Sequence, residues 1–342
     1  MSRPLPILFI HGFNGDPGDW TDGGFRQYLI EHGDLDPDLV RLFRYGVAED
    51  GTYNNRGDAR QIAARLAGVG VNEHDLPSCS VDRLSADSVA RGGPAAVTLI
   101  AHSLGGILSR IYLSRREPDE FDAVYHGRVG RLITIGTPHR GVDLLYLARF
   151  APRDSLPWRL LRLLEKCGLA PALPAQAIDA WEATMNQRQL AARATLAPEL
   201  GAPGTRVLLA DTPIYQQLAP DSPLIAALNR PGTLPEWVEC HCFYGDIRLR
   251  LTVSLSPGGF TLLDETVSFG DMAAPAHSAR EIPAAPSTPH PFVTEISRSF
   301  TLRVGPAEAE TRSLWASLPD TAHGKLLANP AVQDAVLALL ND

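Results

Sequence analysis

The sequence predicts an α/β fold with a mostly parallel sheet, flanking helices and an inserted helical cap. Short apolar runs at residues 7–10 and 97–101 are typical of parallel strands that are buried on both faces, and residues 129–135 form a further predicted strand. Segments with helical spacing lie between these runs, as crossover connections require. From residue 141 this alternation stops, and apolar helical patterns separated by Pro and Gly clusters predict a separate helical unit.

These patterns divide the chain into two parts. A core of residues 1–140 and 236–342 carries the sheet, and residues 141–235 form a cap or lid inserted between two core strands. A chain of 342 residues is long enough for one large core with such an insertion. We therefore expect the cap to lie over a pocket and to shape it.

The remaining elements follow from local patterns. Before the cap we expect a strand at residues 40–45 and helices at 24–33, 58–66, 81–90 and 104–115. After the cap we expect a strand at 237–244, a β-hairpin whose first strand alternates at 249–255, a loop at 273–291, a short strand at 300–304 and a helix at 330–340.

Composition excludes several classes of function. The net charge is −8 and the basic residues form no block, so there is no electrostatic footprint for nucleic acid. No apolar run approaches the ~18 residues of a membrane span, and the first run is too short for a signal peptide. We therefore expect a cytoplasmic protein. The cysteines lack metal-ligand spacing, and we expect no metal and no organic cofactor.

The most informative stretch begins where the run at 97–101 ends. His102-Ser103-Leu104-Gly105-Gly106 follows it directly, and helical spacing begins after the serine. This pattern predicts a sharp strand–turn–helix corner with Ser103 at its tip, which holds the hydroxyl out from the sheet edge. Small residues at 101 and 105 allow the strand and the helix to approach closely. Ser103 is the candidate nucleophile.

Two backbone N–H groups are candidates for stabilising an oxyanion. Leu104 opens the helix after Ser103, so its N–H points toward whatever Ser103 attacks. The first strand ends in the glycine-punctuated loop His11-Gly12-Phe13-Asn14-Gly15, where Phe13, or alternatively Asn14, supplies the second donor.

A serine hydroxyl needs a base, and that base needs an acid to orient it. His323 lies in a loop after the last predicted strand and before the C-terminal helix, which places it last in chain order. His290, between two prolines, is the rival. We expect His241 to lie in a core strand and His139 to fix a turn.

The position of the acid is open between two aspartates. Asp264 follows an apolar, strand-like run, so we expect its carboxylate at a strand end, and it is the first candidate. Asp271 could take the same role if the loop begins later. Asp246 is less suitable because the hairpin carries the chain away from it.

With these motifs the chain resembles the α/β-hydrolase lipases and esterases, with bacterial lipases, lecithin–cholesterol acyltransferase relatives and GPI-inositol deacylases among them. The matching pieces are HGFNG at 11–15, AHSLGG at 101–106, GTPHRG at 136–141, LAPDSPLIAALN at 218–229, DETV at 264–267 and HGKLLANPAVQDAV at 323–336. The family acid usually stands in Gly-Asp-Gly-x-Val. Asp264 keeps the valine without the glycines, whereas Asp271 keeps one glycine without the valine.

The resemblance implies a serine carboxylic-ester hydrolase that works through an acyl-enzyme on Ser103, with His323 as base and the Phe13 and Leu104 N–H groups as oxyanion donors. It leaves the acid open, and Asp264 stays the first candidate on its placement, with Asp271 second. Its substrate would be a small-molecule or lipid ester, and the cap allows transient contact with a lipid surface. An acyltransferase or phospholipid deacylase on the same triad is the alternative, and a catalytically impaired lipid-binding module is the alternative of another class. The sequence leaves the oligomeric state open.

Overall fold

The computed structural model describes residues 5–13, 18–22, 24–45, 57–68, 80–118, 120–142, 213–256, 260–268, 270–271, 273–303 and 319–341. Its centre is one sheet in which β2 (Val40–Phe43), β1 (Ile7–Ile10), β3 (Val97–His102), β4 (Val129–Ile135) and β5 (Glu239–Ser256) lie in that order. Both β6 (Phe260–Ser268) and β7 (Thr288–Arg303) pair with β5. Every pairing is parallel except that of β5 with β6, so the predicted fold class is confirmed.

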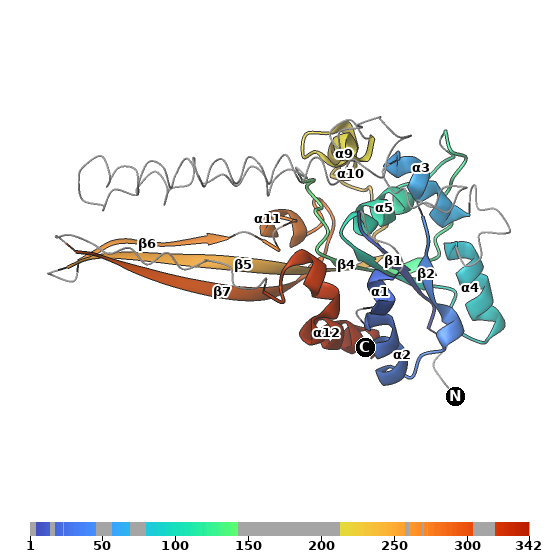
Figure 1. The fold of residues 1–342 in the computed structure, drawn as a ribbon. Coiled ribbons are helices and arrows are strands. Elements are labelled where there is room, and N and C mark those ends of the chain that lie inside the picture. The colour runs from blue at the N-terminus through green and yellow to red at the C-terminus, as the bar shows by residue number, and fades with distance from the viewer. Residues whose placement is uncertain are drawn as a thin grey trace, which may run out of the picture.

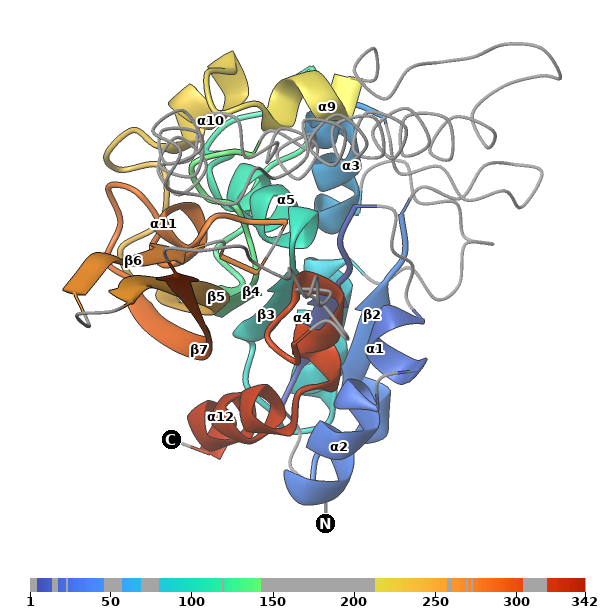
Figure 2. The same cartoon turned by 60° about the vertical axis from the view of Figure 1, so that its left-hand side comes forward.

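Helices cover both faces of this sheet (Figures 1 and 2). One face packs against α1 (Asp19–Asp22), α2 (Phe25–His32) and α12 (Pro330–Asn341). The other face packs against α3 (Ala59–Ala64), α4 (Val81–Ala90), α5 (Leu104–Leu113), α9 (Pro213–Leu218) and α10 (Pro223–Leu228). Burial on both sides explains why the run at 7–10 is apolar throughout and why the run at 97–101 is apolar except for Thr98.

Beyond the body of the sheet, β5, β6 and β7 continue as a long three-stranded arm (Figure 1). β5 has 18 residues and β7 has 16, far longer than the predicted strands at 237–244 and 300–304. The predicted alternation at 249–255 is the outer half of β5, and β6 returns antiparallel beside it. Part of the predicted loop at 273–291 has regular secondary structure, because it contains α11 (Ala276–Ala279) and the start of β7.

The elements before the cap agree with their predicted positions to within a few residues, and α4 begins and ends as predicted. Within the described residues there are also short 3-10 segments at Pro37–Leu39, Arg65–Ala67 and His323–Ala328. Most of the predicted cap, residues 143–212, lies outside the described residues. Its last part forms α9 and α10, whose Ile214, Leu218 and Ile225 are buried in the same cluster as α5.

None of the helices within the described ranges is long and apolar enough to cross a membrane.

Candidate active site

The corner predicted at Ser103 is present between β3 and α5. Ser103 has φ 53° and ψ −122°, a conformation that residues other than glycine seldom adopt. Its N–H donates to the Ile135 carbonyl at 2.9 Å, which fixes it beside the end of β4. The serine therefore occupies a strained turn at the carboxyl edge of the sheet, between the ends of two parallel strands.

Glycines and a threonine allow this corner to close. A Cβ on Gly105 would lie 2.4 Å from the Ile10 carbonyl oxygen, and one on Gly106 would lie 2.2 Å from the Thr137 hydroxyl. The Thr137 hydroxyl in turn donates to the Ser103 carbonyl at 2.9 Å. Thus the turn after β4 braces the serine through Thr137, a role that the sequence motif GTPHRG did not reveal.

His323 is paired with Asp271. Its Nδ1 lies 2.7 Å from Asp271 Oδ2, and its N–H donates to the Asp271 carbonyl at 2.8 Å. The other carboxylate oxygen, Oδ1, accepts from the N–H groups of Ala273 and Ala274 at 3.0 and 2.7 Å. Asp271 is buried, and a buried carboxylate is costly unless it has partners. These donors and the imidazole compensate its charge.

The pair lies beside the turn that follows β4. A Cβ on Gly136 would lie 2.7 Å from Asp271 Oδ2 and 3.0 Å from His323 Nδ1, so only glycine leaves room for them here. Gly136 follows Ile135, whose carbonyl accepts from Ser103. The structure therefore gathers Ser103, His323 and Asp271 at one edge of the sheet.

The electrostatics of this pair raise the proton affinity of the imidazole. Burial lowers the pKa of His323, but the negative charge of Asp271 and its hydrogen bond outweigh burial, so the pKa lies above its ordinary value. An imidazole with such a partner accepts a proton more readily than an isolated buried histidine. This is the property required of a general base that must hold a proton during acyl transfer.

Asp264 lies elsewhere, which corrects the expectation for the acid. It sits in the middle of β6, opposite Thr252 of β5, and not at a strand end. Its exposed carboxylate binds the Arg250 guanidinium through two hydrogen bonds of 2.8 and 2.7 Å. The reason is the length of the hairpin, which carries Asp264 out along the arm.

The other histidines have separate partners. His290, in β7, stacks on Phe243, and its Nε2 lies 3.1 Å from His241 Nδ1. His139 is buried, with Nε2 3.1 Å from the Thr134 hydroxyl, and burial followed by the charge of Arg110 lowers its pKa well below the usual range. None of these three is paired with an aspartate in the described part of the chain.

The loop after β1 lies against the serine. A Cβ on Gly12 would lie 2.9 Å from Ser103 Cβ, so the backbone of this loop meets the corner directly. Phe13 packs at the edge of the core, and Leu104 is the buried first residue of α5. The first N–H groups of a helix have no partner within it, which leaves Leu104 N–H available to a ligand. Asn14 lies outside the described residues.

His102 joins the nucleophile corner to the base. Its Nε2–H donates to the His323 carbonyl at 3.3 Å, and the two ring centroids are 4.6 Å apart. Burial, and then the charge of His323, lowers the pKa of His102 well below the usual range. His102 is therefore a neutral hydrogen-bond donor that holds the backbone of His323.

Neither a family model nor a curated protein sequence matches the chain. Solved structures do. Staphylococcus hyicus lipase is similar at 13% identity and a TM-score of 0.45, over 99% of this chain and 95% of that one. EstA from Clostridium botulinum has 13% identity and a TM-score of 0.41, over 99% and 87%. Phospholipase PlaB from Legionella pneumophila has 12% identity and a TM-score of 0.41, and the match covers 77% of this chain. This chain spans only 50% of the length of PlaB.

The order of the sheet, the crossover helices and the strand–turn–helix corner at Ser103 decide the fold. The chain has the α/β-hydrolase fold. Within the described residues, no group of three or more His, Cys, Asp or Glu side chains is arranged to hold a metal ion.

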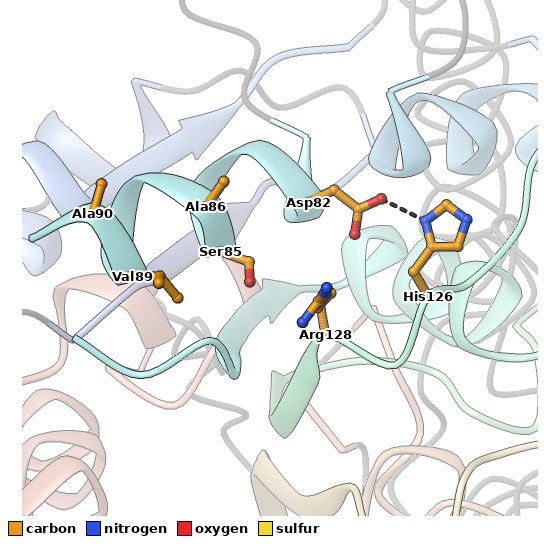
Figure 3. Close-up of a pocket in the computed structure, with 7 residues that line it drawn as sticks. All are labelled: Asp82, Ser85, Ala86, Val89, Ala90, His126 and Arg128. Atoms are coloured by element: carbon orange, nitrogen blue, oxygen red, sulfur yellow. Dashed lines mark hydrogen bonds and ion pairs between the residues drawn. The ribbon is translucent and has the colours of Figure 1, made fainter. Parts of the chain in front are cut away.

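A surface hollow lies far from this edge, beside α4 and the segment before β4 (Figure 3). Its walls include Val89, Arg128 and an Asp82–His126 pair joined at 2.5 Å. None of Ser103, Asp271 and His323 lines it, so we assign it no part in the chemistry.

Proposed function

We propose that the protein is a serine carboxylic-ester hydrolase that works through an acyl-enzyme on Ser103. The observation that carries the proposal is the Asp271 Oδ2–His323 Nδ1 contact of 2.7 Å, beside a serine held at φ 53°. A nucleophile, a base and a buried acid at one edge of the sheet are the components that acyl transfer requires.

The mechanism follows from the roles of these groups. His323 Nε2 takes the proton of the Ser103 hydroxyl as Oγ bonds to the ester carbonyl carbon, and the carbonyl π electrons move to oxygen. The N–H groups of Leu104 and Phe13 stabilise this oxyanion. The imidazolium then gives its proton to the leaving alcohol as the C–O bond breaks. Water repeats the sequence and releases the acid.

Asp271, not Asp264, is the acid in this proposal. Its hydrogen bond places the remaining proton of neutral His323 on Nδ1, so that Nε2 has a free lone pair for the serine proton. Its charge then stabilises the imidazolium.

Hydrolysis of p-nitrophenyl acetate, octanoate and palmitate by the wild type and Ser103→Ala tests the proposal. We expect the wild type to hydrolyse at least one ester and Ser103→Ala to lose at least ~10³-fold in kcat with its thermal unfolding midpoint unchanged. Full activity in Ser103→Ala would exclude this nucleophile. A wild type that is inactive on all three esters would leave a binding module as the better account.

A further inference from the structure

We propose that Tyr45 and His11 are positioning residues that set the direction of the Phe13 N–H, and so form the outer support of the oxyanion site. This inference rests on the function proposed above. Tyr45 and His11 lie in neither the predicted triad nor the predicted pair of oxyanion donors. What points to them is a set of hydrogen bonds to the backbone of the loop after β1.

The sheet register brings Tyr45 to this loop. β1 and β2 are parallel, and Ile10 pairs with Phe43, so the residues that follow each strand emerge at the same edge. Tyr45 is two residues beyond Phe43, and Gly12 is two beyond Ile10. Tyr45 is 1% exposed and its ring stacks on that of His11, with centroids 3.9 Å apart and planes 4° apart.

Two side chains direct hydrogen bonds at one peptide group. The Tyr45 hydroxyl shares its proton between the carbonyl oxygens of His11, at 2.8 Å, and Gly12, at 3.0 Å. His11 Nδ1 also lies 3.0 Å from the Gly12 oxygen, a hydrogen bond in the tautomer that has the proton on Nδ1, because a carbonyl only accepts. Both rings are buried, which fixes the two donors in place.

The Gly12 carbonyl belongs to the peptide unit that carries the Phe13 N–H. This unit is planar and trans, so its C=O and N–H point in opposite directions, and holding the oxygen fixes the N–H. A hydrogen bond to the carbonyl also polarises the amide and strengthens its N–H as a donor. A preorganised donor acts most strongly on charge that develops in the transition state.

Tyr45→Phe is the direct test because it removes the hydroxyl and keeps the ring that stacks on His11. We expect kcat for a p-nitrophenyl ester to fall about tenfold, less than for loss of an oxyanion donor itself, with KM changed less than about twofold. Affinity for a trifluoromethyl ketone, which forms an oxyanion on the serine, should fall by a similar factor. A purely structural role would lower the unfolding midpoint without this pattern.

Tyr112→Phe is the matched control. Tyr112 is also fully buried, but its hydroxyl has no hydrogen-bond partner among the described residues. We expect its kcat, KM and trifluoromethyl ketone affinity to equal those of the wild type.

A second pair of variants covers the case in which Tyr45→Phe does not fold. We expect His11→Leu, which lacks a donor, to lower kcat, and His11→Asn, whose amide can donate from about the position of Nδ1, to restore most of it. The inference would be overturned if Tyr45→Phe and Tyr112→Phe had equal kcat and equal ketone affinity. The same holds if His11→Leu and His11→Asn were equal in both. Either result would leave the proposed function standing. A wild type and Tyr112→Phe that hydrolyse no ester would overturn the proposed function, and this inference with it.

Discussion

At the scale of single residues, His323 and Asp271 are joined through both side chain and backbone. The second carboxylate oxygen is held by two N–H groups, so Asp271 keeps its orientation whether or not the imidazole is charged. Asp264 instead binds Arg250 on an exposed strand, where solvent screens the interaction. The two carboxylates therefore differ in environment as much as in position.

Replacing each aspartate by asparagine separates their roles. We expect Asp271→Asn to lower kcat by about 10³- to 10⁴-fold, because neutral His323 would no longer be held in the tautomer that accepts a proton. Asp264→Asn is the matched control and should change kcat less than about twofold. Steady-state kinetics on one p-nitrophenyl ester measures both, and the opposite order of effects would return the acid role to Asp264.

The pKa of His323 predicts the pH dependence of the reaction. Only neutral His323 can act as base, so kcat/KM should rise with pH through an apparent pKa above the ordinary histidine value of 6.5. In Asp271→Asn the negative charge is lost while burial still lowers the pKa, so the residual activity should rise at lower pH than in the wild type. A pH–rate profile that keeps the same midpoint in both enzymes would contradict this account of the pair.

The corner at Ser103 could be predicted from sequence, whereas the proposed acid could not be assigned to one residue. The corner is a local sequence pattern in which an apolar run ends at Ser103 and two glycines follow at 105 and 106. The acid depends on where a long hairpin ends. β6 begins at Phe260 and ends at Ser268, so Asp264 lies inside this strand, whereas Asp271 lies beyond its end. A prediction of longer hairpin strands would have placed Asp264 inside the second strand, and it would then have favoured Asp271 as the acid.

At the scale of elements, β3 and α5 pass close to the end of β1. Gly105 lies against the carbonyl oxygens of Ile10 and His11, the residues that lead into the loop with the Phe13 N–H. The corner at Ser103 and the loop after β1 are thus in direct backbone contact. Their relative position depends on a side chain being absent at residue 105.

Gly105→Ala tests this contact. The added Cβ would lie 2.4 and 2.7 Å from the two carbonyl oxygens, so the backbone must shift. We expect a loss of about 2 kcal/mol in the free energy of unfolding, together with a lower kcat. Gly57→Ala is the control because a Cβ there meets nothing within 4 Å. Denaturant unfolding checks the first expectation, and equal stability of both variants would argue against the tight approach.

At the scale of the whole molecule, Arg110 links three parts of the chain. It is fully buried on α5 and donates to the carbonyls of His139 at 2.8 Å and Leu228 at 2.7 Å, and to Asn229 Oδ1 at 2.9 Å. Burial lowers its pKa to about 10, and no carboxylate contacts it among the described residues. It therefore connects the nucleophile helix to the turn after β4 and to the end of α10.

Arg110→Ala should reduce the free energy of unfolding by about 3 kcal/mol, because buried carbonyl groups lose their donors. Arg91→Ala is the contrasting variant. Arg91 pairs with Asp36 and Asp38 on the surface, where solvent screens the pairs, so its loss should destabilise the protein much less than the loss of Arg110. Denaturant unfolding compares them, and a larger cost at Arg91 would show that Arg110 is not such a link.

Covalent acylation of Ser103, with the help of His323 and Asp271, is the step on which the proposed function depends. A fluorophosphonate probe reports this directly, since it reacts with an activated serine, and peptide mass spectrometry locates the adduct. We expect one adduct per chain on Ser103 in the wild type, markedly slower labelling in Asp271→Asn and none in Ser103→Ala. Labelling at another residue, or equal rates in wild type and Asp271→Asn, would contradict the account.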